Sequence, residues 1–231
     1  YDAADTLIYS KRSANVLTTI CDKLKHTEAK DAALFRDALH RIDYQLTGSQ
    51  LLAQLLEADE VISLKPEFNH GRFSMKARYA CVIEHIKEVP HAVIKKRRNG
   101  EDAAMLYTSF FEGRDHLAKL AEEWGISLRD VTIGRRPFPS LPLENESMMM
   151  QGISPLRGRL VLTDEGRRAS ERTLIYIESG AVLGYGYYDN DFLFSGDPSD
   201  EMQVAFTPHA ELELVARKFI EKGRFESLKK V

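Results

Sequence analysis

Apolar and polar positions repeat with the period of a helix in the most regular part of the chain. Between Ser49 and Pro66, the side chains of Leu52 and Leu55 fall on one helical face. The hydroxyls of Thr47 and Ser49 stand where a helix needs an N-cap, and Pro66 cannot continue a helix. This segment is therefore predicted to be a capped helix with one buried side.

The same periodicities predict elements in the rest of the chain. Helical spacing covers residues 13–25, 30–39, 113–125 and 208–223. Strand-like runs, several of which alternate apolar and polar residues, cover residues 6–10, 42–46, 78–86, 91–96, 105–111, 160–162, 173–178 and 181–188. Ser179 and Gly180 are expected to form a tight turn between the last two strands. Helices mixed with antiparallel hairpins indicate an α+β fold.

Breaks in these patterns divide the chain into blocks. Residues 134–157 are rich in proline and are expected to form a linker with little regular structure. Before it we expect a small antiparallel sheet with helices over residues 1–72, then a strand–helix extension over residues 73–133. After it, residues 158–231 are expected to form a C-terminal β-hairpin and helix domain.

Composition narrows the class of protein. The 231 residues are 43% hydrophobic, which is enough to bury a sizeable core, and the net charge of −3 provides no overall basic field to hold DNA. Cys21 and Cys81 lie far apart in the sequence, so we expect a reducing compartment and neither a disulfide framework nor a zinc site. Without a run of membrane-spanning length or a visible signal peptide, we expect a cytoplasmic protein with no membrane partner.

Any nucleic-acid surface must then be a local patch of positive charge. The strongest candidate is a basic hairpin tip made of four consecutive cations, Lys95, Lys96, Arg97 and Arg98, followed by Asn-Gly. A run of like charge is usually a solvated face, but these cations could also hold a phosphate backbone. The sequence leaves both interpretations open.

The capped helix and its flanks carry the clearest motif. A Thr-Gly-Ser cap precedes a Leu-Leu-Glu helix with Glu57, and a Lys-Pro-x-Phe-Asn segment ends at Asn69. Upstream, residues 1–9 read as half of a hairpin that ends at Tyr9, and Ser-x-Asn-Val then opens a helix. This frame resembles the GIY-YIG nuclease superfamily, in its excinuclease branch. The family's first hairpin strand would precede Tyr1, so the match begins at the second half of the hairpin.

A second, less specific resemblance covers residues 158–190. An Asp-x-Gly-Arg loop there precedes an Ile-Glu-x-Gly-x-x-x-Gly-x-Gly hairpin. The arrangement is similar to the C-terminal module of bacterial proteins that fuse an epsilon-type proofreading exonuclease of DNA polymerase III to a GIY-YIG domain. This resemblance implies a role in DNA repair or replication, and partners among the proteins of those processes.

The first resemblance implies a site. The family's helix glutamate, here Glu57, binds one divalent ion, Mg²⁺ or Mn²⁺, and the tyrosine at the position of Tyr9 helps to activate water. Asn69 matches the asparagine that completes the catalytic set. The implied activity is metal-dependent hydrolysis of DNA phosphodiesters, selective for DNA structure rather than for sequence, with Lys11 and Arg12 as further DNA-binding residues.

Two departures from the family pattern argue against full activity. Ser10 and Lys11 replace a small residue and a glycine that let the backbone approach the phosphate, and Thr19 replaces a catalytic arginine. Arg12 could substitute for that arginine if the loop is remodelled. Two hypotheses therefore stay open, namely a nuclease with weakened cleavage and an inactive GIY-YIG-derived module that binds DNA or docks a protein.

Overall fold

The computed structural model describes residues 1–25, 30–69, 75–98, 100–133, 135–143, 152–191, 200 and 202–230. The predicted α+β fold is confirmed. The helices are α1 (Val16–Lys25), α2 (Lys30–Ala38), α3 (Gln50–Ser63), the short 3₁₀ turn η1 (Glu67–Asn69), α4 (Phe110–Trp124) and α6 (Ala210–Glu221). The strands are β1 (Tyr79–Ile86), β2 (Val89–Lys96), β3 (Met105–Tyr107), β4 (Arg129–Ile133), β5 (Arg136–Pro142), β6 (Arg159–Glu165), β7 (Glu171–Glu178), β8 (Ala181–Asp189), β9 (Val204–Ala205) and β10 (Ser227–Lys230).

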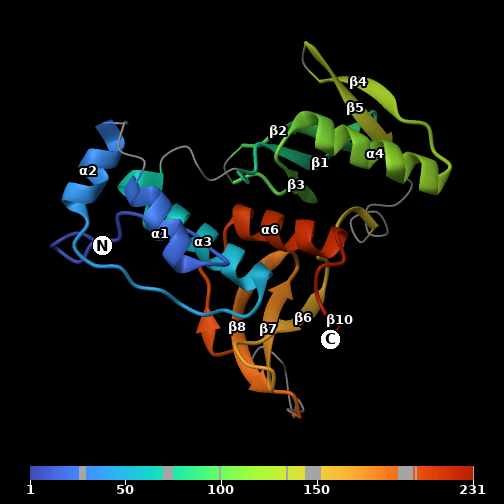
Figure 1. The fold of residues 1–231 in the computed structure, drawn as a ribbon. Coiled ribbons are helices and arrows are strands. Elements are labelled where there is room, and N and C mark those ends of the chain that lie inside the picture. The colour runs from blue at the N-terminus through green and yellow to red at the C-terminus, as the bar shows by residue number, and fades with distance from the viewer. Residues whose placement is uncertain are drawn as a thin grey trace.

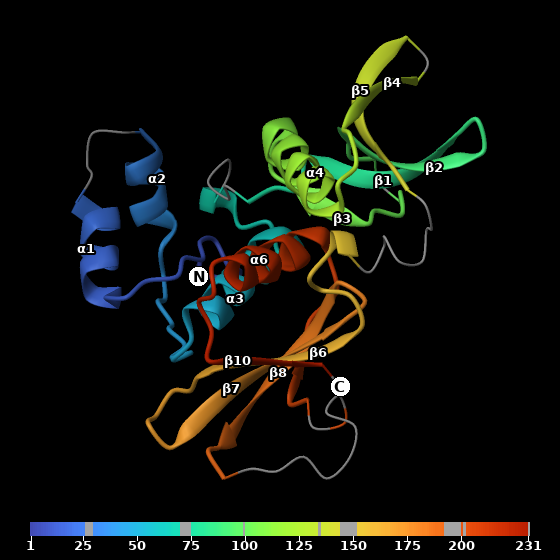
Figure 2. The same ribbon diagram turned by 90° about the vertical axis from the view of Figure 1, so that its right-hand side faces the viewer.

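The described strands form two antiparallel sheets. The N-terminal sheet has the order β3-β1-β2-β5-β4, and the C-terminal sheet has the order β10-β6-β7-β8-β9. Helix α6 lies between the two sheets, and α4 covers the other side of the N-terminal sheet (Figure 1). Helix α1 buries none of its residues, and α1 and α2 stand apart from both sheets (Figure 2). The N-terminal part of the chain is therefore more open than the rest.

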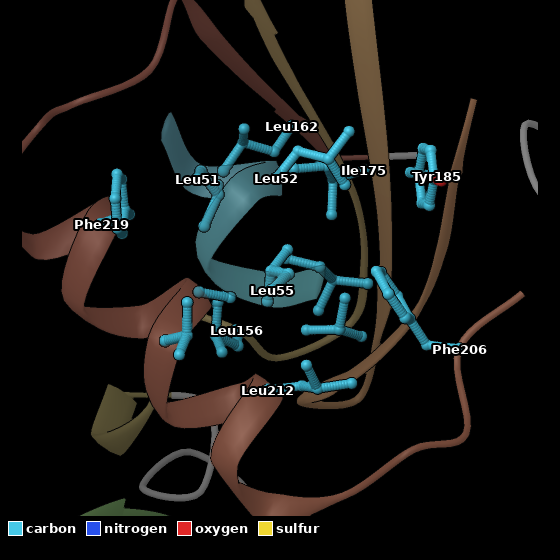
Figure 3. Packing of buried hydrophobic residues seen from close by; sticks show 14 of the residues in the cluster. Leu51, Leu52, Leu55, Leu156, Leu162, Ile175, Tyr185, Phe206, Leu212 and Phe219 are labelled. Atoms are coloured by element: carbon cyan, nitrogen blue, oxygen red, sulfur yellow. The ribbon is translucent and has the colours of Figure 1, made fainter. Parts of the chain in front are cut away.

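Helix α3 belongs to the core of the C-terminal sheet. Its predicted apolar side, including Leu51, Leu52 and Leu55, is fully buried against side chains of the sheet and of α6 (Figure 3). Contributors from those elements include Leu162, Ile175, Leu212 and Phe219. The hydrophobic core thus joins residues 50–63 to the last block of the chain, across the middle of the sequence.

The start of α3 is fixed to the same sheet. The side chain of Ser49 accepts a hydrogen bond from the backbone N–H of Leu52 at 3.0 Å, which confirms the predicted N-cap, and its hydroxyl donates to Asp164 in β6. Gly48 just before it has φ +71, and a Cβ at Gly48 would lie 1.9 Å from the carbonyl oxygen of Gly166. Only glycine fits this close approach.

Two predicted strands, over residues 6–10 and 42–46, are not strands. Neither segment pairs with a strand in the part of the chain that the structure describes. The alternating Ile42, Tyr44 and Leu46 are 46%, 72% and 65% exposed. The reason is that alternation indicates a strand only where a neighbour supplies the ladder of hydrogen bonds, and no neighbour does so here among the described residues.

The predicted linker is also partly wrong. Strand β5 occupies residues 136–142. It pairs with β4 along most of its length and with β2 near its end. Pro137 and Pro139 lie in the stretch that pairs only with β4, where the open edge of the strand tolerates a missing N–H. The strand predicted over 105–111 ends at Tyr107, because Ser109 accepts a hydrogen bond from Glu112 and starts α4.

Candidate functional site

A hollow of about 370 Å³ opens among the N-terminal elements. It is lined by residues 7–13, by one side of α1, by residues 41–45 and by α3. Figures 1 and 2 show α1 at one side of the molecule, away from the N-terminal sheet, whereas α3 lies next to α6. We call this feature the N-terminal hollow.

The N-terminal hollow brings together most of the site residues predicted around the nuclease motif. Tyr9, Lys11, Arg12 and Glu57 all line it. Arg12 Nε lies 3.2 Å from Glu57 Oε2, and the Glu57 side chain is 20% exposed. Burial raises the pKa of Glu57, while the positive charges of Arg12 and Lys11 oppose that rise. Glu57 is therefore a half-buried carboxylate compensated by a guanidinium.

Asn69 is buried and acts on the backbone behind this surface. Its side-chain oxygen accepts from the N–H of Ser10 at 2.8 Å, and its amide donates to the carbonyl of Ser10 at 2.7 Å. The Ser10 hydroxyl also donates to Glu60 of α3. These bonds hold the segment between Tyr9 and Lys11 against α3. In this structure Asn69 is a positioning residue, and it does not line the hollow.

Helix α1 supplies a cation that the sequence analysis missed. Thr19, at the position expected for the family's arginine, lines the hollow and shares a hydrogen bond of 2.6 Å with Ser13. One turn later, Lys23 also lines the hollow, with its Nζ 4.5 Å from the centroid of the Tyr9 ring. The signal that could have found it is the spacing, because residues i and i+4 share one helical face.

The donor atoms suit a divalent ion only in part. The structure shows no group of three or more histidine, cysteine, aspartate or glutamate side chains placed to hold a metal, within the residues it describes. Glu57 and Glu60 offer carboxylate oxygens on one side of the hollow, and one carboxylate is enough for an ion that keeps most of its waters. Glu57 is the carboxylate that the sequence analysis expected to hold an ion, and in this structure it is paired with Arg12.

The predicted basic hairpin tip does not exist as such. The turn between β1 and β2 is made by Lys87 and Glu88, both with positive φ, at the opposite end of the hairpin from residues 95–98. Residues 97–104 instead connect β2 to β3. The prediction was wrong because β3 pairs with β1 and not with β2, so that residues 95–98 do not lie at the tip of a hairpin.

Charge compensation weakens this cluster as a DNA surface. Lys95 Nζ lies 2.6 Å from carboxylate oxygens of both Glu84 and Glu101, and Arg97 lies 3.7 Å from Glu211. The other two cations, Lys96 and Arg98, are exposed. Two of the four predicted cations therefore face acids, which lowers the field that a phosphate backbone would experience.

Within the described ranges, no helix is both long and apolar enough to cross a bilayer. Comparisons of the chain with models of protein families, with characterised proteins and with solved structures found no match.

Proposed function

We propose that the N-terminal hollow binds the phosphodiester backbone of DNA and that the chain is a metal-dependent nuclease of the GIY-YIG type with weak cleavage. The observation that carries the proposal is the meeting in one hollow of Glu57 from α3 with Tyr9, Lys11 and Arg12 from the segment 7–13. The resemblance of about residues 1–70 to that superfamily supports the same assignment.

The electrostatics of the hollow suit an anion. Lys11 and Arg12 present cations beside Glu57, and a guanidinium offers two parallel donors that match a phosphate. A bound phosphate would compete with Glu57 for Arg12, so that binding would free the carboxylate. Because contacts to phosphate carry no sequence information, binding is expected to be independent of base sequence.

In the proposed cleavage, the ion and the side chains of the hollow would have separate roles. When bound, Mg²⁺ or Mn²⁺ would supply Lewis-acid stabilisation of the charge that develops on the phosphate. The hydroxyl of Tyr9 would accept a hydrogen bond from the attacking water and orient it, and Asn69 would keep Tyr9 in position through Ser10. Action on DNA also fits a cytoplasmic location, with repair or replication proteins as further partners.

The test is cleavage of branched and flapped DNA by the full chain in the presence of Mg²⁺ or Mn²⁺. Cleavage by the parent protein should be slow, and Glu57→Gln should abolish it while keeping DNA binding, because the change removes only the charge. The matched control is Glu123→Gln, an exposed carboxylate of α4 outside the hollow. Cleavage by Glu57→Gln at the parent rate would refute the assigned role.

A second candidate, a DNA-binding module without cleavage, is favoured by the ion pair between Arg12 and Glu57 and by the threonine at position 19. Restoring the family residues in a Lys11→Gly, Thr19→Arg double variant separates the two candidates. A rise in rate of a decade, about 1.4 kcal/mol of barrier, would support a weakened nuclease. If both proteins bind DNA and neither cuts it, the binding module is the better assignment.

A further inference from the structure

Lys23 is held at a defined place in the N-terminal hollow. Its Nζ lies 4.5 Å from the centroid of the Tyr9 ring and 4.8 Å from that of Phe35. The two rings meet edge to face at a centroid distance of 5.6 Å, and Phe35 packs in the same way on Phe68 at 5.1 Å. A cation over two aromatic faces is stabilised by their quadrupoles, so the ammonium is fixed beside Tyr9.

The helix also favours a cation at this point. Lys23 lies in the last turn of α1, where the negative end of the helix dipole attracts positive charge. Of the α1 residues that line the hollow, Lys23 is the charged one, and it stands one turn beyond Thr19 on the same face. Phe35 is only 5% exposed, so the ammonium of Lys23 contacts a buried aromatic ring. An anion that enters the hollow would meet Lys23 from one side and Lys11 with Arg12 from another.

We infer that Lys23 is a phosphate-contacting residue of the hollow, and that it supplies from α1 the positive charge that Thr19 cannot supply. This inference rests on the proposed function. The ligand that Lys23 would contact is a phosphodiester of a DNA strand. Three cations from two segments then line the same hollow as Tyr9 and Glu57. The rings of Tyr9 and Phe35 fix the position of the ammonium, which reduces the side-chain entropy lost when DNA binds.

The probe is a fluorescein-labelled flapped DNA duplex, whose binding to the full chain is measured over a series of salt concentrations. Each phosphate contact contributes about 0.9 to the slope of log K against log salt. Lys23→Met keeps the stem over the rings and removes the charge, so the slope should fall by about 1. Lys23→Arg should keep the slope. Lys25→Met, a loss of charge on the same helix outside the lining of the hollow, should also keep it.

A second arm separates this inference from the proposed function. A Lys11→Met, Arg12→Met double variant should flatten the slope by about 2. If that variant flattens the slope while Lys23→Met leaves it unchanged, the role of Lys23 is refuted and the DNA-binding hollow stands. If neither changes the slope, or the parent protein binds no DNA at low salt, the proposed function fails and the inference fails with it. Unchanged thermal unfolding of Lys23→Met shows that the effect is not one of folding.

Discussion

Replacing Arg217 with methionine should destabilise the protein by about 3 kcal/mol at neutral pH, because Arg217 links α6 to the N-terminal sheet through buried polar bonds. Its side chain is 3% exposed, and its Nη2 donates to Glu112 Oε1 and to the carbonyl of Leu106, each at 2.8 Å. Nη1 also pairs with Glu221. Methionine keeps much of the stem but leaves these acceptors without their donor.

The magnitude follows from two features of the site. Removing one partner of a buried ion pair costs about 3 to 5 kcal/mol. Arg217 Nε is buried with no hydrogen-bond partner in the described structure, so the arginine already carries a desolvation cost, and the lower end of the range applies. Glu112 keeps its bonds to the N–H and hydroxyl of Thr108, which limits the loss further.

The pH dependence gives an independent check. Desolvation alone would raise the pKa of Glu112, but hydrogen bonds from Thr108 and Arg217 outweigh it and lower that pKa from 4.5 to about 2. The shift contributes about 3 kcal/mol of stability, present in full above pH 4.5 and lost as the pH falls toward 2. The difference between the parent protein and Arg217→Met should therefore shrink below about pH 4.

The assay is urea unfolding at pH 7 and pH 3, followed by the fluorescence of Trp124 at the end of α4. Lys218→Met is the matched control, since Lys218 lies 3.5 Å from Glu112 but is 23% exposed, and a pair of this kind contributes at most about 1 kcal/mol. A loss below about 1 kcal/mol for Arg217→Met at pH 7 would refute the reasoning. So would a difference that is equal at both pH values.

Three further changes test the packing of α3 by thermal and urea unfolding. Gly48→Ala should lower the free energy of unfolding by about 3 kcal/mol or more, because its Cβ would meet a backbone oxygen at 1.9 Å. Its control is Gly100→Ala, at φ +76 in open space, which should cost about 1 kcal/mol. Equal losses of stability in the two variants would contradict the close approach. Ser49→Ala removes the N-cap and should cost about 1 to 2 kcal/mol, and a neutral change would argue against the cap. Leu55→Ala should cost about 2 to 5 kcal/mol, and a loss below about 1 kcal/mol would mean that α3 is not part of the core.

The sequence by itself determined the elements whose signals are local. The Ser49 cap and the apolar spacing of Leu52 and Leu55 specify α3, and Gly125, with φ +67, caps α4 at the last residue of the segment that was predicted to be helical. The tight turn at Ser179 and Gly180 joins β7 to β8 as predicted, with positive φ at both residues. In each case, neighbours within a few residues carry the information, so periodicity and turn chemistry are sufficient.

Only the tertiary structure decided what depends on residues far away in the chain. The alternation at Ile42 and Leu46 looks like a strand, but whether a strand forms depends on a partner. Arg97 looks like part of a basic patch until Glu211 of α6 comes within ion-pair distance. Such contacts are set by how the two sheets and α6 pack, and a charge or an alternation in one segment contains no information about the segment that will face it.

The candidate site shows the same division. The resemblance around Tyr9, Glu57 and Asn69 rests on short, ordered segments of the sequence, and the site that it implies stays a prediction. Three contacts in and beside the hollow could not be predicted from the sequence. They are the ion pair of Arg12 with Glu57, the hydrogen bonds of Asn69 to the backbone of Ser10, and the position of Lys23 over the Tyr9 ring. Their geometry depends on α1, α3 and the N-terminal segment coming together around the hollow, and this arrangement exists only in the folded chain.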